Sequence, residues 1–368
     1  PLEHETEDPP DVPRPRRTFE QLDVSERERG RLKLRIESDF LSARSDHDAR
    51  IARFRRYFRM WRGLNQTKGT RQDGPDMQIP LIKWTVFGQW AKYMQALLGE
   101  DAEIIAKPTA PSDASDAKKA GRYMTWRFFE YMAAVPMLAA WVFRACLFGR
   151  GFAEIIYEQE HYFERDREVN VDTQKLEAAG LKWYRVGGGM IDYECLAYDG
   201  PRLRALWPSQ LILPAQDNVQ TASDHSWKIR RDRITPQMLM DGEDLGRYQG
   251  IKDNWNQIMA AAQQRQERDY WWDDERVDSD EAEGVDHVNT LGNQDSLEVW
   301  RWYGNWRLLA GKRDARPDNL LYRQVRESEL MVSYLPKVGL IVGIEDLRAI
   351  YPKMRKRDPF VDIATVKD

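Results

Sequence analysis

The 368-residue sequence is poor in cysteine, and it has neither a long uninterrupted hydrophobic run nor a large net charge. Its two cysteines, Cys146 and Cys195, lie far apart in apolar segments, which predicts buried thiols rather than a disulfide or a metal pair. The five histidines are scattered, and no two have the spacing that would place them on one helical face. The sequence therefore indicates neither an oxidising compartment nor a histidine metal site.

The charge balance and the apolar segments exclude further classes of protein. The net charge of −4 arises from 56 basic and 60 acidic residues, so the basic field typical of a nucleic-acid coat protein is absent. Residues 1–17 hold five prolines among charges, which predicts a disordered arm and no signal peptide. The longest apolar stretch, Ile79 to Leu98, contains several polar side chains, so we expect a helix buried on most sides rather than a membrane span. We expect a soluble protein of intracellular origin.

Motifs for catalysis are also missing. No segment fits the phosphate-binding pattern G-x-x-x-x-G-K-[ST], and G-x-S-x-G, H-E-x-x-H and C-x-x-C do not occur. Gly149-Arg150-Gly151 lacks the third glycine of a dinucleotide motif and leads from a helix into a strand, the reverse of that motif's order. Asp273 to Glu283 holds seven acids but lacks the turn glycine of a calcium loop, so we expect an exposed, solvated loop. We predict no enzyme and no cofactor.

Helical signals dominate the first 150 residues. A capping box, Ser25-x-x-Glu28, opens a charged helix to about Ser42, and Ser45-x-x-Asp48 resembles a second helix start. We expect further helices over 79–98 and 115–133 and from Pro136 to Gly149. The helix that begins near Ser45 has an apolar stripe of Ile51, Phe54, Phe58 and Trp61, and we expect Gly63 to end this helix.

The opposite side of that helix carries four arginines: Arg53, Arg55, Arg56 and Arg59. Guanidinium groups match the geometry of phosphate, so a contact with nucleic acid is one interpretation. A contact with the carboxylates of a neighbouring protein, or pairing with acids on the same helix, is the other. The weak overall charge favours the protein contact.

After Gly149 the spacing of apolar residues changes from the repeat of a helix to the two-residue repeat of a strand. We expect a short strand at 152–157, a hairpin over 182–198 that turns at Gly187-Gly188-Gly189, and an extended segment at 203–213. A small helix begins at Thr235-Pro236, and another covers 255–266. The remaining predicted strands are 297–303, with a tight turn at Gly304-Asn305 and a return to Leu309, then 330–335 and 340–344.

Helices followed by strands indicate an α+β protein rather than a parallel α/β sheet. We expect a helical, bundle-like N-terminal half and a mixed, mainly antiparallel β-rich half. The predicted regions are a disordered arm and charged helix at 1–44, a helical region at 45–150, and a β-rich region with interspersed helices at 151–368. Fourteen tryptophans fit either a Trp-rich core or extensive buried interfaces.

These segments, taken together, resemble the portal proteins of tailed bacteriophages over residues 45 to 368. The opening helix, Arg50-x-x-Arg53-Phe54-x-x-Tyr57-x-x-x-Trp61-Arg62-Gly63, is similar to the start of that family. Other matching segments are Ile79-Pro80-Leu81-Ile82, the Cys146 to Gly151 junction, Ala205 to Gln210, Arg230 to Tyr248, Leu297 to Tyr303 and Asp358 to Val361.

The resemblance implies a structural head-to-tail connector in the virion, assembled in the host cytoplasm. Such subunits form a ring, usually a dodecamer, at one capsid vertex, and double-stranded DNA is packaged and ejected through its channel. The implied partners are the major capsid protein, a head-completion adaptor and the terminase motor, with no membrane. The matched residues correspond to the wing, with stem, clip and crown expected after residue 368.

Two alternatives to a portal subunit stay open. Another capsid-associated adaptor or minor head protein would also be an interface protein with little chemistry. A DNA-packaging enzyme is the weaker alternative, because it would need a nucleotide loop or an acidic metal cluster. For a ring-forming protein, the four arginines are candidate contacts to a neighbouring subunit or to DNA.

Overall fold

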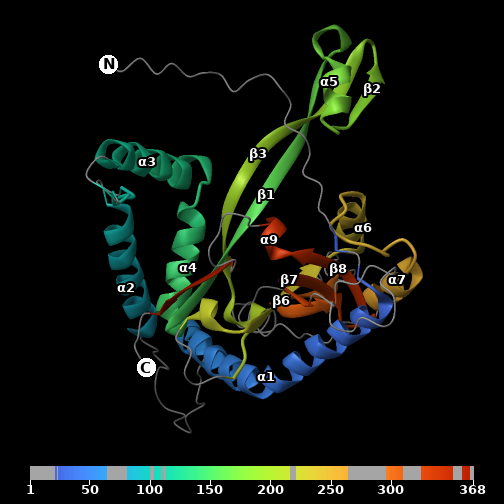
Figure 1. The fold of residues 1–368 in the computed structure, drawn as a ribbon. Coiled ribbons are helices and arrows are strands. Elements are labelled where there is room, and N and C mark those ends of the chain that lie inside the picture. The colour runs from blue at the N-terminus through green and yellow to red at the C-terminus, as the bar shows by residue number, and fades with distance from the viewer. Residues whose placement is uncertain are drawn as a thin grey trace, which may run out of the picture. The chain divides into compact units, whose positions relative to one another are not determined.

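The computed structural model describes residues 21–22, 24–63, 81–99, 103–108, 110, 113–215, 221–263, 296–309, 325–350 and 359–364. The predicted disordered arm at 1–17 and the predicted acidic loop at 273–283 lie outside these residues. The fold is α+β, as predicted, with helices mostly in the N-terminal half and two antiparallel sheets after them (Figure 1).

The first helix, α1 (Glu26–Arg62), is a single helix, so the predicted break between Ser42 and Ser45 is wrong. No glycine or proline interrupts residues 31–62, and the second proposed cap is exposed, with Asp48 paired to Arg44 at 3.7 Å. The helix begins and ends as predicted. The Ser25 side chain accepts a hydrogen bond from the backbone N–H of Glu28, and Gly63 adopts a φ of 78° after the last turn.

Three helical elements follow α1. These are α2 (Leu81–Leu98), α3 (Ala114–Trp126) with the π-helical turn η2 (Arg127–Tyr131), and α4 (Val135–Phe148). The predicted helix over 115–133 thus changes to π-helix before its end, and Ala133 adopts a φ of 45°. α2 and α4 lie side by side, and α1 contacts both of them (Figure 1).

The four-stranded sheet has the order β2-β3-β1-β9. Its strands are β2 (Trp183–Gly187), β3 (Met190–Leu206), β1 (Arg150–Arg167) and β9 (Phe360–Ala364). The glycine hairpin is confirmed, because Gly187, Gly188 and Gly189 all have positive φ. β1 is much longer than the predicted strand at 152–157. The second half of β1 is polar and does not alternate between apolar and polar residues as a half-buried strand does. The sequence pattern therefore predicted only the first part of the strand.

The described chain divides into two compact units. One contains Ile156–Arg202, and the other contains the described residues of Phe19–Ile155 and Leu203–Asp368. The first unit includes the short helix α5 (Thr173–Ala178), which the sequence reasoning missed. Its small core consists of Leu176, Ala179 and Leu181.

The five-stranded sheet belongs to the second unit and has the order β4-β5-β6-β7-β8. Its strands are β4 (Leu211–Ile212), β5 (Trp227–Ile234), β6 (Leu297–Leu309), β7 (Val325–Leu335) and β8 (Leu340–Asp346). The predicted turn at Gly304-Asn305 is wrong, since β6 continues through it and pairs with β7. Gly304 instead makes room for Trp302: an added Cβ would lie 2.5 Å from the indole ring.

Hydrophobic cores cover both faces of this sheet. α1 packs Leu32 and Ile36 against Trp302, Val332 and Tyr334 on one part of it. Among its described residues, the unit also contains the helices α6 (Pro236–Asp244), α7 (Trp255–Gln263) and α9 (Leu347–Ile350). α6 begins as predicted, with the Thr235 side chain accepting a hydrogen bond from the backbone of Met238.

Among the described helices, none is by itself long and apolar enough to span a membrane. The bent pair formed by residues 114–131 and 135–148, which meet at 86°, does satisfy length and composition together.

Candidate functional site

The C-terminal half of α1 presents two different faces, as the sequence predicts. Phe54 and Phe58 are buried against residues of α2 and α4, and Ile51 and Trp61 pack at the edge of the same core. Each fully buried large side chain of this kind contributes roughly 1.5–3 kcal/mol. The four arginines named above are all exposed on the other side of the helix. We call Arg53, Arg55, Arg56 and Arg59 the arginine face.

The helix α2 differs from its prediction. Of its 18 residues only Val86 is buried, although the helix was expected to be covered on most sides. α1 and α4 cover one side of it, where the Trp90 indole donates a hydrogen bond to the carbonyl of Ala139 at 3.0 Å. The rest of its apolar surface faces outward. A helix that is apolar around most of its circumference is normally buried, but the described residues cover only one side of α2.

The exposed apolar side chains of α2 are large, and between 39% and 62% of each is accessible. Similar side chains lie on α3, where Tyr123, Met124 and Trp126 are about half exposed. The rings of Tyr123 and Trp126 contact each other with centroids 6.0 Å apart. We call this set the α2–α3 apolar surface: Leu81, Ile82, Trp84, Phe87, Tyr93, Leu97, Tyr123, Met124 and Trp126.

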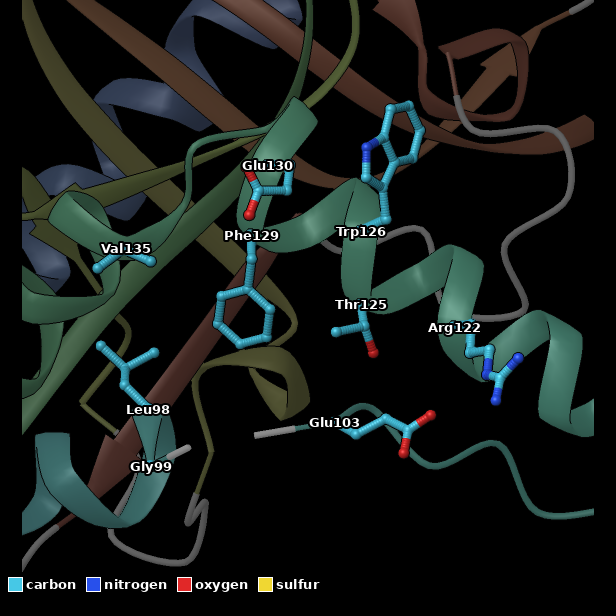
Figure 2. Close-up of a pocket in the computed structure, with 9 residues that line it drawn as sticks. All are labelled: Leu98, Gly99, Glu103, Arg122, Thr125, Trp126, Phe129, Glu130 and Val135. Carbon is cyan, nitrogen blue, oxygen red and sulfur yellow. The ribbon is translucent and has the colours of Figure 1, made fainter. Parts of the chain in front are cut away.

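A pocket of about 560 Å³ opens where the end of α2 meets α3, η2 and α4 (Figure 2). Leu98, Phe129 and Val135 gather on one side of it, while Glu103 and Arg122 lie on the other. Glu130 lies beside Phe129, so apolar and charged side chains line the pocket together, as in clefts that bind a small ligand or a partner's side chain.

The wall of this pocket depends on a glycine. The Thr125 hydroxyl accepts a hydrogen bond from the backbone N–H of Ile104 at 2.9 Å, and this bond holds the segment 103–108 against α3. A Cβ on Gly121 would lie 2.7 Å from the carbonyl oxygen of Ile104, so only glycine permits this approach. The close approach of the two backbone segments therefore fixes this wall of the pocket.

A buried charge network lies between the two sheets. Arg230 is almost fully buried and pairs with Glu154 of β1 and with Asp232, the latter at 2.8 Å. Arg301 contacts the other oxygen of Asp232 at 3.3 Å, and the Tyr303 hydroxyl donates to Glu154 at 3.0 Å. This network was not predicted from the sequence. Its signals were the run of charged residues from Arg230 to Arg233 in β5, and the charges of Glu154 and Arg301 within apolar segments.

The network is suited to structure rather than catalysis. Burial opposes ionisation of Asp232, but Arg301 and Arg230 hold the pKa of that carboxyl below its usual value. Asp232 and Glu154 are both paired with arginine, so neither is poised as a general acid or base. The ion pairs connect β1 of one sheet to β5 and β6 of the other.

Other reactive groups are few in the described part of the chain. No three His, Cys, Asp or Glu side chains converge there as a metal site would require, and the acidic segment 273–283 lies outside it. Cys146 and Cys195 are free thiols and only partly buried. Burial raises the pKa of both thiols, which lowers their reactivity.

No protein-family model matches the chain, and no curated protein matches it.

Proposed function

We propose that this chain is a structural subunit of a bacteriophage portal ring, in which it forms the wing. The proposal combines the resemblance of residues 45 to 368 with the surfaces described above. A closed ring repeats one patch of the subunit against a different patch of its neighbour. The α2–α3 apolar surface and the arginine face supply two such unlike patches.

The α2–α3 apolar surface is the observation that carries this proposal. It has nine large side chains that are each roughly half exposed, including Trp84 at 62%. Large aromatic side chains bury about 150–250 Å² each, so covering this set would remove on the order of 700 Å² per copy from water. A stable interface buries about 800 Å² per partner. These side chains point around much of α2, so one neighbour would cover part of the set, and that part would contribute to a subunit contact.

The arginine face is proposed as a polar part of the same assembly. Its four guanidinium groups fit the carboxylates of a neighbouring copy, and the chain as a whole is slightly acidic. Double-stranded DNA passing through the ring is the competing partner. The major capsid protein, an adaptor and the terminase motor are proposed as further partners on the resemblance alone. We propose no catalytic activity and no cofactor.

Charge reversal distinguishes the two partners of the arginine face. The double variant Arg55→Glu, Arg56→Glu should reduce the ring fraction in native mass spectra, because like charges would then meet across the interface. The matched control is Arg185→Glu, another exposed arginine, in the other compact unit. If the double variant assembles normally but particles retain less DNA, the arginines contact DNA instead. A wild-type protein that stays a monodisperse monomer at micromolar concentration would refute the ring itself.

A further inference from the structure

The buried face of α1 carries basic side chains between the two apolar cores to which the helix contributes. Its N-terminal part buries Leu32, Ile36 and Ala43 beneath the five-stranded sheet, and its C-terminal part buries Phe54. His47, which is only 3% exposed, and Arg50 occupy the positions between these parts on the same helical face. The helix therefore places two basic side chains between its two apolar cores.

Basic groups of other elements lie within electrostatic range of Arg50 or of one another. They are Arg150 at the start of β1, His225 just before β5, and Lys228 in β5. Lys228 is buried, and its ammonium donates to the carbonyl of His225 at 3.4 Å. We call the following six residues the basic cluster: His47, Arg50, Arg53, Arg150, His225 and Lys228.

The positive charges of the basic cluster repel one another. Burial, Arg150 and Arg53 together lower the pKa of Arg50 to about 10, although Asp46 partly offsets them. Burial, Arg50 and Arg231 lower the pKa of His47 to about 3. The same effects, from burial and then Lys228, Arg150 and Arg50, lower the pKa of His225 to about 4. Both imidazoles are thus neutral at pH 7.

The carboxylates nearby are engaged elsewhere or exposed. Asp362 binds Arg150 through one oxygen, at 2.9 and 2.7 Å, and its other oxygen accepts the backbone N–H of Ala222. Glu298 is paired with Arg231, and Asp46 is exposed.

Arg50 has no comparable partner. Within the described residues, no carboxylate lies at ion-pair distance from Arg50, and its Nε–H has no hydrogen-bond acceptor. The Nδ1 atoms of His47 and His225 also lack partners there. Unpartnered buried donors are costly, and they are normally satisfied by a ligand, water or ion.

We propose that the basic cluster binds a phosphate-type oxyanion, held by the guanidinium groups of Arg50 and Arg53, with Arg150 adding positive charge beside them. Arginine forks bind phosphate oxygens with paired N–H donors, and the free Nε–H of Arg50 supplies one such donor. The cluster has an open edge, because Arg53 is exposed and 28% of the Arg150 side chain is accessible. The anion would come from free phosphate or from the backbone of DNA. The inference does not depend on the ring.

The first test compares Arg50→Met with Arg55→Met, which removes an exposed arginine from the other side of the same helix. Inorganic phosphate should raise the Tm of the wild-type protein relative to chloride at equal ionic strength. The increase should persist in Arg55→Met and disappear in Arg50→Met. In chloride, Arg50→Met should melt no lower than wild type, because it removes an uncompensated charge. A lower Tm in chloride, with the phosphate effect intact, would show a purely structural arginine and overturn the proposal.

A second variant keeps the test decisive if Arg50→Met does not fold. Arg53 is exposed, so Arg53→Met should fold normally and still weaken phosphate binding at least threefold by calorimetry. Bound phosphate should also shift the NMR titrations of His47 and His225 to higher pH, because a nearby anion favours the imidazolium. Unchanged affinity in Arg53→Met together with unshifted histidines would refute the site.

A short DNA duplex separates the two sources of the anion. If DNA supplies it, phosphate should compete with the duplex, and Arg50→Met should weaken duplex binding. If free phosphate supplies it, duplex binding should be the same in both proteins while the phosphate effect on Tm remains. Native mass spectra of the same samples report ring formation separately, so a failed anion site and a failed ring are distinguishable.

Discussion

The five-stranded sheet and the helix α2 differ in whether they bury or expose their charged and apolar side chains. The sheet buries charge, with Arg230 almost inaccessible between its two ion-pair partners Glu154 and Asp232, and α1 covers its tryptophans. α2 exposes Trp84, one of its two tryptophans, and buries only Val86. Within the described residues, the sheet is covered by its own chain, whereas α1 and α4 cover only one side of α2. Under the proposed function, a neighbouring molecule covers the rest of α2.

The largest expected effect comes from breaking the buried charge network. Arg230→Ala would remove the buried arginine that pairs with both Glu154 and Asp232, which should cost about 3–5 kcal/mol of unfolding free energy. The exposed pair of Arg185 and Glu168 is the control, and Arg185→Ala should cost at most about 1 kcal/mol. Urea denaturation measures both. Equal losses in the two variants would mean that the sheet does not depend on its buried charges.

One substitution made in both regions sharpens the comparison. Gly304→Ala in β6 should destabilise the chain by about 1–3 kcal/mol, because the new methyl group would collide with Trp302. Gly88→Ala in α2 meets nothing within 4 Å and should instead stabilise the monomer by about 0.5–1 kcal/mol. Thermal melts at low concentration test the pair. The same sign of change in both would contradict the proposed difference in packing.

A smaller effect concerns the helix α1, which contacts both regions. The pKa of His47 is about 3 in the folded chain and 6.5 in an exposed histidine, so the unfolded chain binds more protons between these values. Stability that is fully present above pH 6.5 is therefore lost as the pH falls towards 3. His47→Asn should make stability fall less steeply between pH 7 and 4.5. Identical slopes for variant and wild type would show that His47 is not held neutral.

Local signals in the sequence predicted much of the fold. Ser25 and Thr235 cap helices as expected, and Gly63 ends a helix in the left-handed region. Each of these features depends on a few neighbouring residues. The exposure of the arginine face was also predictable, because it follows from the apolar stripe of Phe54 and Phe58 on the same helix.

The wrong predictions concern features that depend on tertiary contacts. Gly304 looked like a turn residue, but it is a strand residue that accommodates Trp302. α2 looked like a core helix, because composition reports how apolar a helix is and not whether its own chain covers it. Arg50 was counted with the portal-like motif, and its burial became apparent only when β1 and β5 were brought beside α1. Long-range pairing of this kind leaves no local pattern.

The central claim is that the apolar surface of α2 is an assembly surface, and Trp84→Asp tests it most directly. Trp84 is exposed, so the variant should change the unfolding free energy of the monomer by no more than about 0.5 kcal/mol. Val169→Asp, at a residue that is 95% exposed in the other compact unit, is the matched control. Native mass spectrometry should find closed rings for the wild type and for Val169→Asp, and monomers for Trp84→Asp. Rings that persist unchanged in Trp84→Asp would contradict the account.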